Sequence, residues 1–115
     1  VGPNVKCKIN ATKPAKTSLL YLREIQEHRR VDKQLSGSVP IQILQRYEKW
    51  KDIARVSGPQ GLRLIKGFHD EALSGEWKGH RSSRLGLQWR VIYRVVANVL
   101  LIQVVQVTAH DYRRP

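Results

Sequence analysis

Two consecutive apolar stretches near the end of the sequence limit most strongly the folds that this chain can adopt. Residues 88–96 alternate between two faces, and one of these faces carries Trp89, Val91, Tyr93 and Val95. This period of two predicts a β-strand with a different environment on each side. Residues 99–108 are almost wholly apolar, which indicates a strand that is covered on both sides. Ala97 and Asn98 favour a tight turn between the stretches, which together predict a β-hairpin.

The first part of the sequence predicts one strand followed by one helix. Residues 4–10 alternate apolar side chains with lysines, a pattern typical of an edge or near-edge strand. A helix is then expected from Thr12, as its N-cap, to about Gln34, with Gly37 terminating it.

A second helix is predicted from Ser38, as its N-cap, to the Ser57-Gly58-Pro59 segment. Its apolar residues recur at helical spacing on one face: Ile43, Tyr47, Trp50 and Ala54. The short connection suggests an antiparallel helical hairpin with the first helix. Residues 61–67 fit either a short helical turn or a short strand, and residues 68–75 fit a loop or a single helical turn.

This order of elements predicts an α+β fold. We expect a small antiparallel β-sheet of three to four strands, in the order β-α-α-β-β-β, with the N-terminal two-helix hairpin packed on one face. The strand face that carries Trp89 would pack on the helices, and the face that carries Arg90 and Arg94 would look the other way. The 115 residues fit a single domain, residues 1–115.

The charge of the chain is strongly positive. The formal net charge is +12 at pH 7, which predicts an acidic partner such as nucleic acid, a membrane surface or an acidic protein. After Glu76 the sequence has a single acidic residue, Asp111, among the basic residues Lys78, Arg81, Arg84, Arg90, Arg94, Arg113 and Arg114. A sheet that concentrates one sign of charge in this way is a candidate anion-binding surface.

Several kinds of site and location are disfavoured by the composition. The single cysteine, Cys7, cannot form an internal disulfide, which favours a reducing and therefore cytoplasmic location. The longest apolar run is far shorter than the roughly 20 residues that span a bilayer, so we expect no membrane partner. The sequence has neither clustered Cys and His ligands for zinc nor a phosphate-binding glycine loop, so we expect no metal or cofactor.

Three segments carry a resemblance to a known family. They are LSGEWKGHRSSRL at residues 73–85, QWRVIYRV at residues 88–95 and VTAHDYRR at residues 107–114. Together with the order of elements, they resemble the RelE/ParE superfamily of bacterial type II toxins. The pattern is closest to the ribosome-dependent mRNA interferases of the RelE, YafQ and HigB kind.

The resemblance implies a metal-independent endoribonuclease that inhibits translation. Such a toxin enters the ribosomal A site, where the mRNA 2′-OH attacks the adjacent phosphate and leaves a 2′,3′-cyclic phosphate and a 5′-OH. This chemistry needs a base for the 2′-OH, an acid for the leaving 5′-oxygen and cations for the charge at phosphorus.

The resemblance also indicates catalytic candidates: His110, Arg90, Arg84, Tyr112 and Glu71. His110 lies where the interferase pattern places a catalytic histidine, and the ordinary pKa of histidine suits proton transfer near neutrality. Arg90 lies where RelE-like interferases contact the scissile phosphate with an arginine fork. Where the YafQ pattern has a second histidine this sequence has Arg84. Where the same pattern has another histidine it has Glu71, and some relatives use a glutamate as the base. Tyr112 would stack on a base or donate to the phosphate.

A second group of residues is expected to bind RNA: Arg81, Lys78, His80, Arg94, Arg113 and His69. Arg81 and Arg84 flank one strand, where the RelE-like pattern uses basic residues. His80 matches a position that is tyrosine or histidine in the family, and it is either structural or stacked on RNA.

The resemblance implies partners, and two other functions stay open. A cognate acidic antitoxin would form a hetero-oligomer with the toxin and make Arg84, Arg90 and His110 inaccessible or misarranged. The ribosomal A site and mRNA would be the other partners. The first alternative is a ParE-like, non-nucleolytic inhibitor of DNA gyrase, because one fold can host both activities. The second is a basic RNA-binding domain without activity.

Overall fold

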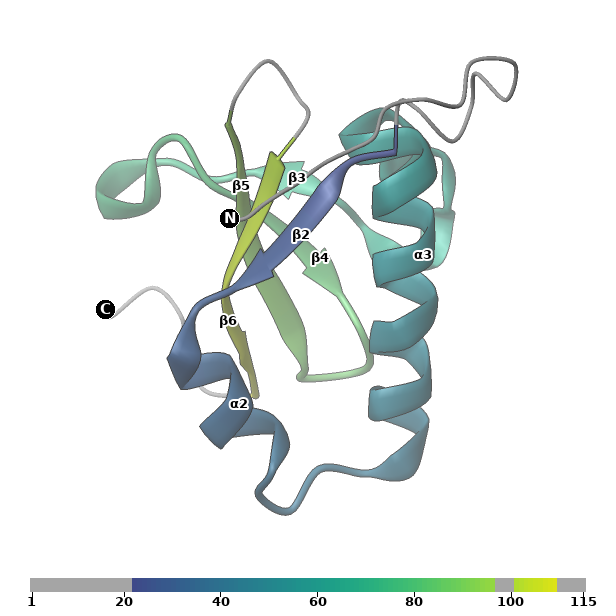
Figure 1. Cartoon of the computed structure of the whole chain (residues 1–115), viewed down its shortest axis with the longest axis vertical. Coiled ribbons are helices and arrows are strands. Elements are labelled where there is room, and N and C mark those ends of the chain that lie inside the picture. The colour runs from purple at the N-terminus through teal and green to yellow at the C-terminus, as the bar shows by residue number, and fades with distance from the viewer. Residues whose placement is uncertain (1–21, 97–100, 110–115) are drawn as a thin grey trace, which may run out of the picture.

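A mixed five-stranded sheet, ordered β2-β6-β5-β4-β3, forms the centre of the computed structural model, which describes residues 22–96 and 101–109 (Figure 1). Its strands are β2 (Glu24–Glu27), β3 (Glu71–Ala72), β4 (Arg81–Arg84), β5 (Arg90–Val96) and β6 (Leu101–Thr108). The other elements are α2 (Arg29–Leu35), α3 (Ile41–Leu64) and the 3₁₀ turns η2 (Lys66–Phe68) and η3 (Gly75–Trp77). The predicted α+β class is therefore confirmed.

The predicted hairpin is formed by β5 and β6. The two strands are antiparallel, with Arg90 opposite Thr108 at one end and Val96 opposite Leu101 at the other. A β-bulge interrupts the register between Ile92 and Tyr93. The predicted turn at residues 97 and 98 lies outside the described residues. β4 pairs with β5 and β3 pairs with β4, both antiparallel, whereas β2 runs parallel to β6.

The predicted helix from Thr12 to Gln34 is wrong at residues 24–27 but confirmed at residues 29–34. Its first part lies outside the described residues, as does the predicted strand at residues 4–10. Glu24–Glu27 forms β2 instead, and helical structure begins only at Arg29. The apolar strand β6 offers an unpaired row of backbone groups, and pairing with it satisfies the backbone of β2. This tertiary pairing overrides the local helical pattern.

The helix α3 confirms the predicted apolar face but not the predicted ends. Its buried residues include Ile43, Tyr47, Trp50 and Ala54. Pro40 occupies the N-cap position in place of Ser38. At the other end Gly58 kinks the helix without ending it, with φ 65° and ψ −161°, and helical structure continues to Leu64. Residues 61–67 are thus the end of this helix and the start of η2.

A single side chain, Arg23, fills the kink in α3. Its Nη1 donates to the backbone oxygens of Arg55 at 3.3 Å and Val56 at 2.9 Å. These two carbonyls come just before Gly58, where the helical hydrogen-bond pattern is interrupted. Arg23 therefore satisfies backbone groups that the kink would otherwise leave unpaired.

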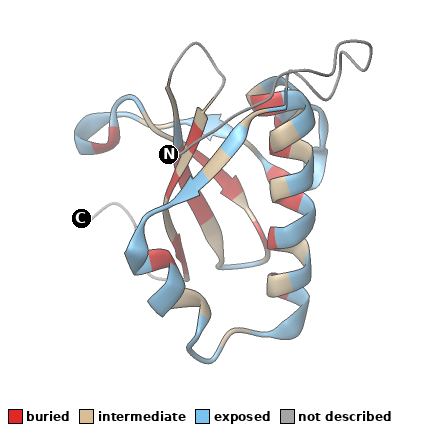
Figure 2. Cartoon of the chain, viewed as in Figure 1, coloured by how far each residue is buried: buried red, intermediate tan, exposed pale blue. Residues whose placement is uncertain are grey.

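The core lies between α3 and one face of the sheet, and Figure 2 shows the buried residues along the facing sides of these elements. Trp50 is at its centre, with ring centroids 5.9 Å from Tyr47 and 5.1 Å from Tyr93. Val91 and Tyr93 belong to this core, and Trp89 and Val95 pack against it, as the alternation predicted. Within residues 22–96 and 101–109, no helix has the length and apolar character needed to cross a bilayer.

Candidate functional site

Arg84 and Arg90 lie directly opposite each other on β4 and β5. Arg90 is in turn opposite Thr108 on β6, so three strands contribute to one row at this end of the sheet. Residues that are directly opposite in an antiparallel pair project from the same face. The face of this row is the one turned away from the α3 core, because the core-facing residues of β5 are Val91 and Tyr93. The structure therefore brings the two predicted phosphate-binding arginines together.

The two arginines differ in their local contacts. Arg90 Nη1 donates to Ser82 Oγ at 3.3 Å, which places the guanidinium over the neighbouring strand. Arg84 is half-buried, and its Nε has no hydrogen-bond partner in the part of the chain that the structure describes. A buried donor without a partner is unfavourable unless a ligand or water satisfies it. Arg84 is therefore well suited to an anionic ligand.

Glu71 lies on the same face as this arginine row. It is exposed on the edge strand β3, directly opposite Ser82. Because Ser82 and Arg84 are two residues apart on β4, Glu71 and Arg84 are diagonal neighbours, for which the typical Cα separation is about 7–8 Å. A carboxylate that could accept a proton thus lies beside two guanidinium groups.

Arg81 takes a different position from the one expected. We predicted that it would bind RNA together with Arg84, but Arg81 is opposite Tyr93 and projects toward the α3 core. There its guanidinium forms an ion pair at 2.7 Å with Asp70, whose side chain is 0% exposed. Arg81 thus lies on the opposite face of β4 from Arg84 and is paired with a buried carboxylate, and its role in RNA binding stays a prediction.

The Asp70 carboxylate is the acceptor of a buried network. Arg81 Nε and Ser83 Oγ each donate to it at 2.7 Å, and the Tyr93 hydroxyl is a third donor. Burial and the hydrogen bond to Asp70 raise the pKa of Tyr93 above its ordinary value. Burial disfavours the charged form of Arg81, but the hydrogen bond and charge of Asp70 outweigh it and raise the Arg81 pKa. Asp70 was missed from the sequence, where no pattern distinguishes it from a surface aspartate.

Three further candidates lie in the connections before β3 and β4. His69 is exposed and has a left-handed backbone conformation, with φ 44°. Lys78 is exposed just after η3. His80 is half-buried, with its ring edge-on to Trp77 at a centroid distance of 5.2 Å. This contact favours the structural interpretation of His80.

The remaining candidates lie at the other end of the sheet or beyond the described residues. Arg94 is exposed and donates from Nε to Gln103 Oε1 at 2.8 Å, toward the opposite end of β5 from Arg90. His110, Tyr112 and Arg113 lie outside the described residues. In the sequence His110 follows Thr108, the partner of Arg90, by two positions.

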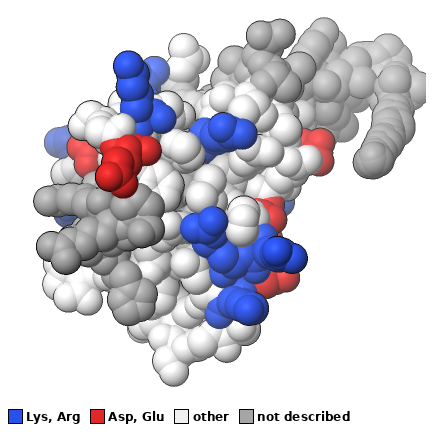
Figure 3. Space-filling model, turned by 90° about the vertical axis from the view of Figure 1, so that its left-hand side faces the viewer, with Lys and Arg blue, Asp and Glu red and all other residues white. Residues whose placement is uncertain are grey.

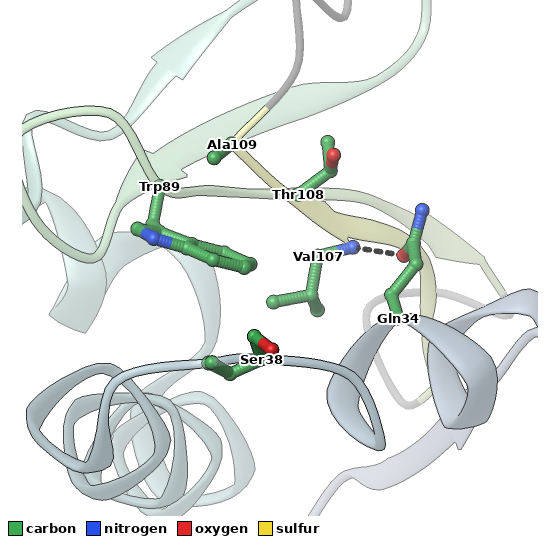
Figure 4. A pocket seen from close by; sticks show the side chains of 7 residues that line it. Gln34, Ser38, Trp89, Val107, Thr108 and Ala109 are labelled. Atoms are coloured by element: carbon green, nitrogen blue, oxygen red, sulfur yellow. Dashed lines mark hydrogen bonds between the residues drawn. The ribbon is translucent and has the colours of Figure 1, made fainter.

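A pocket of about 320 Å³ lies near the end of the sheet that carries Arg90 and Thr108. It is formed between α2, the connection to α3 and the end of β6 (Figure 4). Its lining residues are Gln34, Ser38, Val39, Trp89, Val107, Thr108 and Ala109. Gln34 Oε1 accepts a hydrogen bond from the Val107 backbone N–H at 2.7 Å, which fixes the orientation of the amide. The pocket thus combines an apolar floor with a few oriented polar groups.

Basic side chains also gather outside the arginine row. Figure 3 shows a cluster of Lys and Arg side chains in the lower half of the face drawn there, bordered by acidic side chains. On α2 and its N-cap, a surface hollow is lined by His28, Arg29, Arg30 and Lys33. Among the described residues, no group of three or more His, Cys, Asp or Glu side chains could hold a metal ion.

Comparisons with known proteins give matches among solved structures. No protein-family model matches the chain, and no curated protein sequence matches it significantly. The RelE–RelB complex of the archaeon Pyrococcus horikoshii is similar with a TM-score of 0.60 and 26% identity, over 76% of this chain and 93% of that chain.

Two further structures from bacterial complexes show the same fold at lower identity. The heterotetrameric YoeB–YefM toxin–antitoxin complex of Staphylococcus aureus matches with a TM-score of 0.59 and 16% identity, over 77% of this chain and 98% of that chain. The DinJ–YafQ toxin–antitoxin complex of Escherichia coli matches with a TM-score of 0.55 and 19% identity, over 75% of this chain and 90% of that chain.

Proposed function

Since the chain has the fold of the RelE/ParE toxin superfamily, we propose that it is the toxin of a type II toxin–antitoxin system and that it cuts mRNA on the ribosome. The observation that carries this proposal is the pairing of Arg84 with Arg90 on a sheet face that also holds Glu71. Two guanidinium groups supply permanent positive charge for a phosphate, and the carboxylate supplies a base.

In the proposed reaction the RNA 2′-OH attacks the adjacent phosphorus and the bond to the 5′-oxygen breaks. Glu71 takes the proton of the 2′-OH, since it lies beside the arginine row. Arg84 and Arg90 stabilise the charge that develops on the phosphate oxygens. His110, assigned by resemblance and by its place after Thr108, returns a proton to the leaving 5′-oxygen. Tyr112 is proposed to stack on a base or to donate to the phosphate.

A reconstituted translation reaction tests this proposal. Ribosomes, a defined mRNA and the purified protein are combined, and single-turnover cleavage is measured for the wild type, Arg84→Ala and Arg90→Ala. Loss of one preorganised donor is expected to slow cleavage about 100-fold or more. Arg63→Ala is the matched control, since Arg63 is exposed in the last turn of α3, away from the row. Equal rates for all three arginine variants would reject the proposed site.

A gyrase inhibitor is the second candidate, because the fold is shared with a solved structure described as a YoeB/ParE toxin from Agrobacterium tumefaciens, at 16% identity and a TM-score of 0.58. The same wild-type preparation distinguishes the two. Absence of ribosome-dependent cleavage together with inhibition of DNA supercoiling would favour the gyrase inhibitor.

We also propose an acidic antitoxin as the protein partner in a hetero-oligomer. This is supported by the net charge of +12 and by similar solved structures that are toxin–antitoxin complexes. The antitoxin would make Arg84, Arg90 and His110 inaccessible or misarranged. A complex in which all three stay accessible and aligned would contradict this part of the proposal.

A further inference from the structure

We propose that the pocket beside Trp89 binds one nucleobase of the RNA, stacked on the indole and hydrogen-bonded by Gln34. For the identity of its ligand this inference rests on the proposed RNA-cleaving function. It concerns a different part of the surface from the arginine row, because Trp89 and Arg90 project from opposite faces of β5.

The dimensions and walls of the pocket suit a flat, largely apolar ligand. Its volume of about 320 Å³ is within the range of small-molecule sites. Trp89 is half-buried, so part of its indole remains accessible to a ligand, while Trp50 and Trp77 are buried. In Figure 4 the indole of Trp89, the residue just before β5, and the side chain of Val107 on β6 face the pocket. Stacking on an accessible aromatic ring is the usual way in which proteins hold an unpaired base.

The polar groups of the pocket favour one class of base. Gln34 Oε1 is occupied by the Val107 backbone N–H, so the amide orientation is fixed and Nε2 is the group left to donate to a ligand. Figure 4 shows this nitrogen directed away from the bond to Val107. Ser38, on the exposed connection between the helices, adds a hydroxyl. A donor at this position prefers a carbonyl oxygen, so uracil or guanine is expected to bind better than adenine.

The pocket and the proposed phosphate site involve residues that are adjacent in the chain and across the sheet. Trp89 and Arg90 are consecutive, and their Cα atoms are therefore about 3.8 Å apart. Thr108 lines the pocket and is also the cross-strand partner of Arg90. One nucleotide that crosses the end of the sheet could thus place its phosphate at Arg90 and its base against Trp89. This proximity to a cationic row favours a nucleotide over an apolar side chain of a protein partner.

Binding of short oligonucleotides tests the inference without ribosomes or cleavage. The probes are a uridine trinucleotide with a central 2′-deoxy residue, which blocks attack at that position, and the same molecule with an abasic central residue. Affinities are measured by titration calorimetry at low salt. Wild type is expected to bind the complete probe about 10-fold or more tightly than the abasic one. Trp89→Leu is expected to abolish this difference, and Trp89→Phe to retain most of it.

A second variant keeps the test valid if Trp89→Leu does not fold. Gln34→Glu retains an oxygen for the Val107 N–H but replaces the Nε2 donor by an acceptor. Its added negative charge weakens all probes, so the informative quantity is the ratio of affinities for uracil and adenine at the central position. This ratio is expected to favour uracil in wild type and to fall or reverse in the variant.

The outcomes separate this inference from the proposed function. Equal binding of the complete and abasic probes by wild type would overturn the pocket assignment, and so would an unchanged uracil-to-adenine ratio in Gln34→Glu. Base-dependent binding that disappears in Trp89→Leu supports the pocket even if the ribosome assay finds no cleavage. In that case the proposed cleavage would fail and the base-binding site would remain.

Discussion

Replacement of Asp70 by alanine is expected to lower the free energy of unfolding by about 4 kcal/mol. The carboxylate is fully buried and accepts hydrogen bonds from Arg81, Ser83 and Tyr93. Removing one partner of a buried ion pair costs about 3–5 kcal/mol, because the remaining charge stays uncompensated. The orphaned hydroxyls of Ser83 and Tyr93, both 0% exposed, add about 1–3 kcal/mol each when no water replaces the carboxylate. We therefore take the middle of the ion-pair range as a conservative value.

Urea denaturation followed by far-ultraviolet circular dichroism measures this effect. With a slope of about 1.5 kcal/mol/M for a small domain, the midpoint should fall by about 2–3 M urea. A loss of this size is a large part of the roughly 5–15 kcal/mol that stabilises a typical domain. The Asp70→Ala protein is therefore expected to be close to unfolding at 37 °C.

Asp52→Ala is the matched control, because it removes the same side chain from an ion pair with an arginine. The distance from Asp52 to Arg55 is 3.0 Å, but the two side chains are 76% and 40% exposed. Pairs of this kind contribute between about 0 and 1 kcal/mol. Equal shifts of the midpoint for the two variants would refute the argument that burial and multiple donors make the Asp70 network strong.

Three further results are expected. Gly58→Ala should lower stability by about 2–4 kcal/mol in a thermal melt, since its positive φ is strained for alanine. The new Cβ would also lie 2.7 Å from the nearest guanidinium atom, whereas Gly37→Ala, with 3.8 Å to its nearest neighbour, should change little. Glu71→Gln should slow cleavage in the ribosome assay about 100-fold or more without changing the melting temperature, because the side chain is exposed. Burial first, and hydrogen bonds to carboxylates second, raise the pKa values of Tyr47 and Tyr93 in the folded state. The contribution of these two tyrosines to the free energy of unfolding should thus be fully present below about pH 10 and fall as the pH rises further. Phenolate absorbance should show that Tyr47 and Tyr93 ionise only when the protein unfolds.

Each of these results has a contradicting outcome. A Gly58→Ala protein with the melting temperature of the wild type would mean that the kink in α3 relaxes without a loss of stability. Full cleavage by Glu71→Gln would move the role of the base to another residue, His69 first. Ionisation of all tyrosines near pH 10 in a protein that stays folded would contradict the buried hydrogen bonds of Tyr47 and Tyr93.

The hairpin and the apolar face of α3 could be predicted because each has an unambiguous period. In β5 the alternation placed Tyr93 on the core side and Arg90 on the other, and the structure agrees. The stripe that includes Trp50 is buried as expected. These patterns are local: they predict which residues face the core, and they do so without knowing which residues on other elements they will contact.

The errors arose where a specific distant partner decides the structure. β2 is a strand because β6 is beside it, and nothing within residues 24–27 indicates this pairing. Arg81 was grouped with Arg84 because both are basic and close in sequence. Their separation of three residues puts them on opposite faces of a strand, and Arg81 pairs with the buried Asp70 on the core side.

The position of β6 within the sheet has a consequence for synthesis of the protein. β6 follows the other described strands in the sequence, yet it lies between β2 and β5. The side chains that pair across β2 and β6, Gln26 and Gln103, are 77 positions apart. A nascent chain therefore cannot close its sheet until β6 has left the ribosomal tunnel, and contacts of such long range form slowly. Since Arg90 is paired with Thr108 on β6, the proposed site would be the last region to assemble. A chain that terminates before β6 would then lack a complete sheet and the proposed site.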